Sequence, residues 1–443
     1  HNPTCGKNKK EERFILMKRF LSILLAILML AVMLPVTAMA AEGDPAPVNG
    51  VWNVTPANAQ DVLDGKYGSI DGTTIVLGKG DYGQLELGRA TAYPDSNTKY
   101  YTFKGGYDAP TEVSDYDTAE ALKTTLADTS TYHGNLKYTR SLNNVTIKAA
   151  DGAAVNVAGV SMQSAHIYGT GSTTVHDYVL DRDIADANGS FWLVHHVNGI
   201  KFVGLNFTGN VNIASSLNDA VISGFTFDGC SFTTNGTASS NGQALRYYNE
   251  NNNGQVSDLT VKNCTFTNCY QGVYTMKIKN VAVENCDFNT TGHNAIAIQG
   301  EACNHGNVVI TNNEFKNIGD RIVRFNIIGE GTTITIKNNT SVNSGDSNGE
   351  IIAANSRPES VQVTMSGNTW GNVGKKEAKN GAGFENVVNE PGTITIIVPP
   401  TEETPKPAED QKNPTTGAND MVAAAAALMA VSALGMAVLS RKK

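Results

Sequence analysis

Short stretches in which apolar and polar residues alternate recur along the middle of the chain, separated by turns rich in Asn and Gly. One set of these stretches covers residues 220–222, 259–261, 281–283, 308–310, 333–336 and 361–363. A second set covers residues 244–247, 272–275, 295–298, 322–325 and 351–354. Period-two alternation with β-branched residues predicts strands. The pattern therefore predicts two sets of short strands that recur in step along the chain.

A short phrase returns after each member of the first set. It reads Cys230-Ser231-Phe232, Cys264-Thr265-Phe266 and Cys286-Asp287-Phe288, and continues as Asn313-Glu314-Phe315, Asn339-Thr340-Ser341 and Asn368-Thr369-Trp370. The returns fall 34, 22, 27, 26 and 29 residues apart. A repeat of roughly 20 to 50 residues indicates stacked supersecondary units, none of which buries its apolar face alone.

These units predict an all-β fold, a right-handed parallel β-helix with two or three short strands per coil. Because successive coils stack at about 4.8 Å, like residues form ladders. We therefore expect inward Asn side chains to bond along the stack and Phe rings to pack on one another. The alternative is an antiparallel sandwich, which needs hairpin signals about every 8 to 12 residues, and few are present.

The repeat over residues 143–372 resembles the right-handed β-helix superfamily, which includes pectate lyases, polygalacturonases and many bacterial surface proteins. The resemblance covers about half of the chain, and it implies a fold rather than an activity. We predict a β-helix over 143–398 and a coil and cap region over 41–142. Within the latter, residues 54–87 are expected to form an opening coil, and 118–127 a helix in a Tyr-rich insertion.

Residues 17–40 have the pattern of a secretory signal peptide. Lys18 and Arg19 precede an apolar run, and Ala38 and Ala40 form an A-x-A cleavage site. A transmembrane anchor is the alternative, which Pro35 disfavours. Residues 1–16 are polar and lie upstream of the export signal, so they are expected to be an artefact.

The last 31 residues resemble the cell-wall sorting signals of Gram-positive surface proteins. Asn413-Pro414-Thr415-Thr416-Gly417 follows a Pro/Thr/Glu spacer over 399–412, and an apolar stretch over 421–439 precedes a basic tail. The resemblance implies that a sortase cuts between Thr416 and Gly417 and joins Thr416 to peptidoglycan. Asn413 stands where Leu is usual, which leaves the type of sortase open. A single-pass membrane protein is the alternative. Either way, the body of the protein is expected outside the cell.

Charged residues make up 17% of the chain and the formal net charge is −8, which argues against nucleic acid as a partner. The exported part is expected to be a monomer. It retains five cysteines, an odd number that does not indicate a disulfide framework. Three of them share one repeat position, as expected for a buried ladder, and their redox state stays open. No Cys/His spacing indicates zinc.

Aligning the second strand set places Arg246, Tyr274 and Arg324 in one outward column, with the two Arg three coils apart, about 14 Å. Arg forks onto carboxylate or sulfate, so the column predicts a surface for an acidic sugar chain. The predicted binding residues are Arg246, Tyr274, Arg324, Tyr248, Arg321, Gln299 and Asn326, with Gln243, Gln271, Asn294, Glu350 and Asn355 flanking them. The alternative is a solvated face whose Arg residues pair with Asp320 and Glu350.

No catalytic motif is strong. The fragments Asn285-Cys286-Asp287 and Gly292-His293 are distantly similar to polygalacturonase motifs, but the paired Asp is absent and Asn294 follows His293. Hydrolysis with inversion needs two carboxyls about 6.5 to 9.5 Å apart. A lyase needs a base and a cation that neutralises the uronate. The candidates for catalysis are Arg324, Arg246, Asp320, Glu350, His293 and Asp287.

No cofactor is expected. Asp181-Arg182-Asp183, with Asp186 and Asn188-Gly189, forms a loose calcium-like loop that fails the EF-hand spacing. Calcium there is an alternative to a solvated loop, and His195-His196 is expected to serve packing. The sequence thus predicts a wall-anchored protein that binds polysaccharide or host glycan through an exposed sheet face. The alternative is a polysaccharide lyase or glycoside hydrolase that acts on acidic polysaccharide.

Overall fold

The computed structural model describes residues 44–89, 98–104, 111–113, 134–167, 191–217, 220–234, 242–250 and 255–392. The expected signal peptide, insertion helix, calcium-like loop, spacer and sorting signal lie outside these residues. Within them, no helix is both long enough and apolar enough to cross a membrane.

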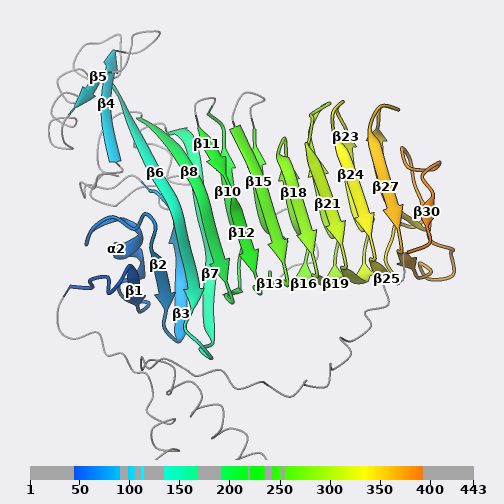
Figure 1. Cartoon of the computed structure of the whole chain (residues 1–443), viewed down its shortest axis with the longest axis horizontal. Helices are drawn as coiled ribbons and strands as arrows, with labels where there is room; N and C mark the ends of the chain where they lie inside the picture. The colour runs from blue at the N-terminus through cyan, green and yellow to red at the C-terminus, as the bar shows by residue number, and fades with distance from the viewer. Residues whose placement is uncertain are drawn as a thin grey trace, which may run out of the picture. The chain divides into compact units, whose positions relative to one another are not determined.

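Nearly every described strand belongs to a right-handed parallel β-helix, as the sequence predicts (Figure 1). We divide its strands into three rows. The first row contains β1 (Val51–Val54), β2 (Thr74–Leu77), β6 (Gly134–Ala149), β8 (Phe191–Val203), β11 (Val221–Ser223), β12 (Phe225–Asp228), β15 (Gln255–Lys262), β18 (Lys279–Glu284), β21 (Asn307–Thr311), β24 (Thr333–Lys337), β27 (Gln362–Ser366) and β30 (Asn389–Glu390).

The other two rows form the second sheet. The second row contains β9 (Asn206–Phe207), β13 (Ser231–Thr233), β16 (Thr265–Cys269), β19 (Asp287–Thr291), β22 (Glu314–Ile318), β25 (Thr340–Val342) and β28 (Thr369–Trp370). The third row contains β3 (Gly80–Glu86), β7 (Val155–Ile167), β10 (Val211–Ser215), β14 (Gln243–Asn249), β17 (Gln271–Met276), β20 (Ile296–Gln299), β23 (Val323–Ile327), β26 (Glu350–Ser356) and β29 (Lys379–Asn380).

The N-terminal end departs from this regular pattern. A short helix, α2 (Ala59–Leu63), buries Ala59, Val62 and Leu63 in the main core. Strand β4 (Thr98–Lys104) pairs antiparallel with β6 and with β5 (Thr111–Val113). The sequence pattern did not predict this helix or these antiparallel strands.

The turn between the first and second rows explains the repeated phrase. One residue of this turn has a left-handed backbone in six successive coils, namely Gly229, Asn263, Asn285, Asn312, Asn338 and Gly367, with φ between 52° and 65°. Asn and Gly are the residues that tolerate this conformation. The next residue of each coil is buried, and these residues are Cys230, Cys264, Cys286, Asn313, Asn339 and Asn368.

The expected side-chain ladders are present. Asn313 donates from Nδ2 to Oδ1 of Asn339 at 3.0 Å, and Asn339 donates likewise to Asn368 at 2.9 Å. The Phe232, Phe266 and Phe288 rings stack with centroids 4.5 and 4.6 Å apart. Cys230, Cys264 and Cys286 form a column of buried free thiols in the same interior. Each ladder ties one coil to the next through the core, so the coils hold a fixed register.

Candidate functional site

The register of the third row aligns the expected column. Arg246 lies opposite Tyr274, Tyr274 opposite Ala297, and Ala297 opposite Arg324. We call these four positions and those in line with them the outer column. The residues that precede them in the strands, Leu245, Val273, Ile296 and Val323, belong to the core and are fully buried. Because side chains alternate along a strand, the outer column points away from the core.

Arg246 lies between two tyrosines. Its Cζ atom is 4.5 Å from the ring centroid of Tyr248 and 6.0 Å from that of Tyr274. These are cation–π distances. Within the described part of the chain no carboxylate forms an ion pair with Arg246. Burial raises the pKa of Tyr274, although the charge of Arg246 opposes the shift, so its hydroxyl stays protonated at neutral pH.

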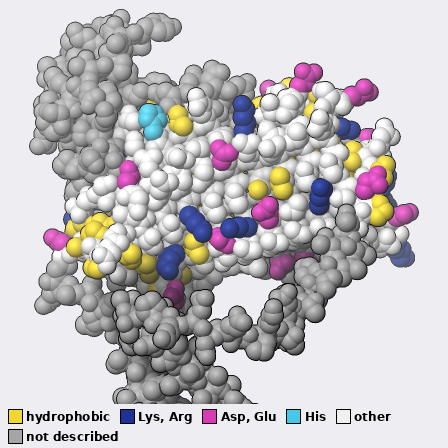
Figure 2. Space-filling model, in the orientation of Figure 1, with side chains coloured by type: hydrophobic (Ala, Val, Ile, Leu, Met, Phe, Trp, Pro, Cys, Tyr) yellow, Lys and Arg dark blue, Asp and Glu magenta, His cyan; other side chains and the backbone are white. Residues whose placement is uncertain are grey.

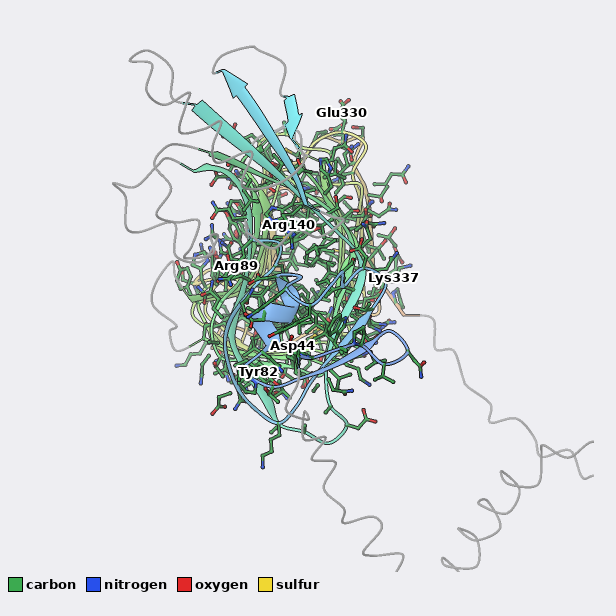
Figure 3. The ribbon with its side chains drawn as sticks, turned by 90° about the vertical axis from the view of Figure 1, so that its left-hand side faces the viewer. Asp44, Tyr82, Arg89, Arg140, Glu330 and Lys337 are labelled. Atoms are coloured by element: carbon green, nitrogen blue, oxygen red, sulfur yellow. The ribbon has the colours of Figure 1, made fainter. Side chains whose placement is uncertain are left out.

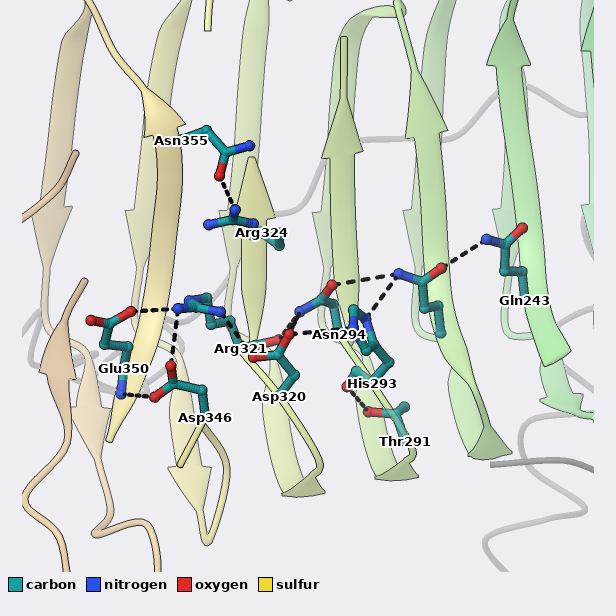
Figure 4. Close-up of polar contacts among 11 residues, drawn as sticks. Gln243, Thr291, His293, Asn294, Asp320, Arg321, Arg324, Asp346, Glu350 and Asn355 are labelled. Atoms are coloured by element: carbon teal, nitrogen blue, oxygen red, sulfur yellow. Dashed lines mark hydrogen bonds and ion pairs between the residues drawn. The ribbon is translucent and has the colours of Figure 1, made fainter. Parts of the chain in front are cut away.

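Arg324 is also without a carboxylate partner among the described residues. Its guanidinium donates to Oδ1 of Asn355 (Figure 4). Asn355 in turn donates to Oδ1 of Asn326 at 2.6 Å. Burial lowers the pKa of Arg324, and the nearby charge of Arg321 lowers it further. A guanidinium nevertheless remains charged in proteins. Arg324 therefore bonds to a neutral amide, while the charges of Asp320 and Glu350 act on it without forming an ion pair.

Beside the outer column runs a chain of polar contacts that we call the polar ladder (Figure 4). Gln243 donates to Oε1 of Gln271 at 2.8 Å, and Nε2 of Gln271 lies 3.4 Å from Oδ1 of Asn294. Asn294 donates to Oδ2 of Asp320 at 3.0 Å, and Asp320 contacts Arg321 at 3.1 Å. The ladder thus connects side chains from four successive coils.

Arg321 ends the polar ladder within a group of three carboxylates. Its Nη2 atom lies 2.9 Å from Oδ2 of Asp346 and 2.5 Å from Oε2 of Glu350, in addition to the Asp320 contact. Burial lowers the pKa of Arg321, but the hydrogen bond with Glu350 and the three negative charges outweigh it and raise the pKa overall. Arg321 therefore has the ion pairs of the solvated-face alternative, whereas Arg246 and Arg324 do not. Its guanidinium is not available for an anionic ligand.

Sequence reasoning did not find Asp346. This residue lies in the turn before β26, where its Oδ1 accepts hydrogen bonds from the backbone N–H groups of Asn348 and Glu350 at 2.8 and 2.9 Å. The local signal was the Asp-x-Asn-Gly sequence, which is typical of a turn closed by an Asp side chain. The turn orients the other carboxylate oxygen toward Arg321.

Of the other catalytic candidates, His293 lies beside the polar ladder and Asp287 does not. The Nε2 atom of His293 is 3.5 Å from Oδ2 of Asp320, and its ring stacks on Tyr270 with centroids 5.2 Å apart. Asp287 belongs to the second row, where it lies opposite Glu314. It is exposed on a different face from Arg246 and Arg324. The structure therefore brings His293, Asp320 and Glu350 together and leaves Asp287 apart.

A second polar cluster, which sequence reasoning missed, lies at the N-terminal end, the end that faces the viewer in Figure 3. Arg89 forms a two-pronged contact with buried Asp64, and Arg140 donates to the backbone oxygen of Asp64 at 3.3 Å. Arg140 is itself fully buried. Arg89 and Arg140 lie 25 and 76 positions from Asp64 in the sequence, so no local pattern indicates this cluster.

His195 belongs to this N-terminal end and serves packing, as expected, whereas His196, for which packing was also expected, is exposed. It is fully buried, with Nδ1 2.7 Å from Oγ of Ser164 and Nε2 2.9 Å from the backbone oxygen of Gly88. Burial lowers the pKa of His195 to about 4, so the ring is neutral at pH 7. Among the residues with described positions, no group of three or more His, Cys, Asp or Glu side chains is arranged to hold a metal ion.

The first-row face has a different charge pattern from the third row. Figure 2 shows its acidic and basic side chains interspersed. Asp228, for example, lies 3.5 Å from Lys201 and 3.4 Å from Lys262, and these three residues come from successive coils. These contacts pair the charges of Lys201 and Lys262 with Asp228.

No protein-family profile matches the chain, and no curated protein sequence matches it. Among solved structures, the chain is similar to a mannuronic acid specific polysaccharide family 6 lyase from human gut microbiota. The two are 8% identical, and the match covers 72% of this chain and 86% of the lyase with a TM-score of 0.20. Nothing about the activity of this chain rests on that similarity.

Proposed function

We propose that this protein binds an acidic polysaccharide along its third row. Arg246 and Arg324 would contact acidic groups of the ligand, and Tyr274 between them would pack against a sugar ring. The observation that carries the proposal is the contrast among three arginines of this face. Arg321 contacts three carboxylates, whereas Arg246 and Arg324 pair with none in the described part of the chain. Guanidinium groups in that condition are suited to fork onto carboxylate or sulfate.

The spacing supports an extended ligand. Arg246 and Arg324 belong to strands three coils apart, about 14 Å at the usual strand separation. A ligand that contacts both must therefore run along the axis of the coil stack. The polar ladder would line one side of it and offer amide and carboxylate groups to sugar hydroxyls. Tyr248, Asn326 and Asn355 lie on the other side.

Titration calorimetry with the exported chain tests this proposal. Polygalacturonate, alginate and a sulfated glycosaminoglycan would be compared with uncharged dextran. We expect Arg246→Ala and Arg324→Ala each to weaken binding to the preferred acidic polymer by about tenfold or more, since a charged hydrogen bond contributes roughly 1.5–3 kcal/mol. Lys316→Ala is the matched control, because Lys316 is a cation of the second row that pairs with Glu314 at 2.9 Å. Unchanged binding in both Arg variants would overturn the proposal.

Catalysis is the second candidate, and the His293–Asp320 contact of 3.5 Å favours it. A histidine that lies next to a carboxylate and near two arginines is suited to proton transfer. Incubation with the same polymers distinguishes the two functions. A lyase releases unsaturated uronate, which absorbs in the ultraviolet, and a hydrolase releases reducing ends without that absorbance. If product forms, its loss in His293→Ala would support catalysis. Binding without any product would exclude catalysis and leave binding as the function.

We also propose that the protein is displayed on a Gram-positive cell wall. This rests on the order of the motif Asn413-Pro414-Thr415-Thr416-Gly417, the apolar stretch 421–439 and the basic tail. Extraction of cells with hot detergent tests it, because covalently attached protein stays with the wall until a muralytic enzyme releases it. Deletion of residues 413–417 should move the protein out of that fraction. Complete extraction of the unaltered protein by detergent would exclude covalent attachment.

A further inference from the structure

Arg324 of β23 has two asparagines as outward neighbours. Its register partner in the next coil is Ala353 of β26, whose side chain has no polar group. Two residues further along each strand, Asn326 and Asn355 occupy equivalent positions of the two coils. Because side chains alternate along a strand, Arg324 and both asparagines point outward. Asn355 is exposed and the other two are partly exposed, so a ligand in solvent is able to reach this group.

The two amides set the direction of the contact with Arg324. Asn355 donates from Nδ2 to Oδ1 of Asn326 at 2.6 Å. An asparagine amide has one acceptor oxygen and one NH2 group. With its NH2 group directed at Asn326, Asn355 turns its Oδ1 toward Arg324 and accepts a hydrogen bond from Nη2 (Figure 4). We call Asn326 and Asn355 the amide clamp.

Carboxylates on the other side attract the same guanidinium. Burial and the charge of Arg321 lower the pKa of Arg324, and the charges of Asp320 and Glu350 act in the opposite direction. Figure 4 shows Asn355 on one side of Arg324 and these carboxylates on the other. An arginine side chain is long and has much rotamer freedom. Without the amide clamp, Arg324 would therefore turn toward Asp320 and Glu350.

We infer that Asn355 is a positioning residue of the proposed binding site, which holds the Arg324 guanidinium apart from the carboxylates and keeps it for an acidic group of the ligand. The inference rests on the proposed function, because it concerns the same Arg324. A neutral amide fixes a guanidinium without cancelling its charge, whereas a carboxylate at the same place would form an ion pair with it. The preference for acidic ligands therefore depends on a neutral side chain at position 355.

Titration calorimetry of single and double variants with the preferred acidic polymer tests the inference. Asn355→Ala removes no charge, yet we expect it to weaken binding about fivefold, within the range of coupling between residues in contact. In the Arg324→Ala background the same change should have no further effect, because Asn355 acts only through Arg324. Losses that add in the double variant would show that Asn355 contacts the ligand itself, and would overturn the positioning role.

Asn355→Asp provides a second test. We expect its carboxylate to pair with Arg324, so binding should weaken about as much as in Arg324→Ala, roughly tenfold. Affinity should also fall less steeply as salt rises, because one ion contact is lost, as is known for nucleic acids. Asn53→Asp is the matched control, since it adds the same charge at an exposed position of β1 in the first row. Unchanged affinity and salt dependence in Asn355→Asp would contradict the inference.

The inference and the proposed function fail differently. If Arg324→Ala weakens binding while Asn355→Ala matches the unaltered protein, the positioning role is overturned and the proposed function stands. If neither Arg246→Ala nor Arg324→Ala weakens binding, both are overturned. Because Asn355 is exposed, its substitution should leave the thermal unfolding temperature nearly unchanged. That measurement separates weaker binding from loss of the fold.

Discussion

Arg321 and Arg324 belong to the same coil, three residues apart, yet only Arg321 contacts carboxylates. Arg321 contacts Asp320 of its own coil and Asp346 and Glu350 of the next, whereas Arg324 bonds to the neutral amide of Asn355. Arg321 thus fastens two coils together. Arg324 forms no ion pair with a described carboxylate, although the charges of Asp320 and Glu350 act on it.

This difference predicts that truncating the two arginines has unequal effects on stability. Arg321→Ala should lower the free energy of unfolding by about 1–3 kcal/mol, because it leaves three carboxylates close together without their cation. Arg324→Ala should change it by less than about 0.5 kcal/mol. Urea denaturation measures both values. An equal loss in the two variants would contradict the separate roles of these arginines.

The Asn ladder predicts a second effect on stability. Asn339 donates to Oδ1 of Asn368 and to the backbone oxygen of Ile310, and it accepts from the backbone and side chain of Asn313. Asn339→Ala leaves several buried groups without partners, so we expect a loss of about 2–4 kcal/mol. Asn53→Ala replaces an exposed Asn of β1 and should cost about 0.5 kcal/mol or less. Similar losses in the two variants would show that the ladder does not stabilise the stack.

Phe266 occupies the centre of the aromatic stack, with both neighbours within 4.6 Å between ring centroids. Phe266→Ala should cost about 3–5 kcal/mol, since it opens a cavity that the rigid coils cannot close. Val342→Ala on the surface, where Val342 is 57% exposed, provides the control and should be nearly neutral. Differential scanning calorimetry would show the contrast as a large drop in Tm for Phe266→Ala alone.

The buried Glu86 predicts a pH dependence of stability. Its pKa rises from an ordinary 4.5 to about 8 in the folded protein, where Arg89 and Asp64 are the charged groups that act on it. Between these values the folded state binds more protons than the unfolded state. The free energy of unfolding must therefore fall as pH rises through this window, by at most about 1.4 kcal/mol per pH unit.

His195 acts in the opposite direction at lower pH. Its pKa falls from 6.5 to about 4 on folding, so below pH 6.5 the unfolded state binds the extra proton and stability declines with acidification. The window from pH 6.5 to 8 therefore separates the effect of Glu86 from that of His195. Chemical denaturation across that window should show a falling free energy for the unaltered protein and a nearly flat one for Glu86→Gln. The same slope in both proteins would exclude Glu86 as its source.

Several features of the candidate site could be predicted because a parallel coil obeys a local rule. Once strands stack in register, residues at equivalent positions become neighbours, so the phrases around Arg246, Tyr274 and Arg324 were sufficient to align them. Strand register could not place Asp346, because this residue lies in a turn of irregular length. The buried Glu86 could not be predicted either, because the chain between β3 and β10 departs from the repeat.

By itself, the sequence determined the coil, its inward Cys, Asn and Phe ladders, and the outward line of Arg and Tyr. Alternation of side chains and the left-handed Asn or Gly of each turn are properties of neighbouring residues. Only the tertiary structure decided which arginines are paired with carboxylates and which one bonds to a neutral amide. Those outcomes depend on side chains that are distant in the sequence and on the burial that stacking imposes, and no local pattern encodes them.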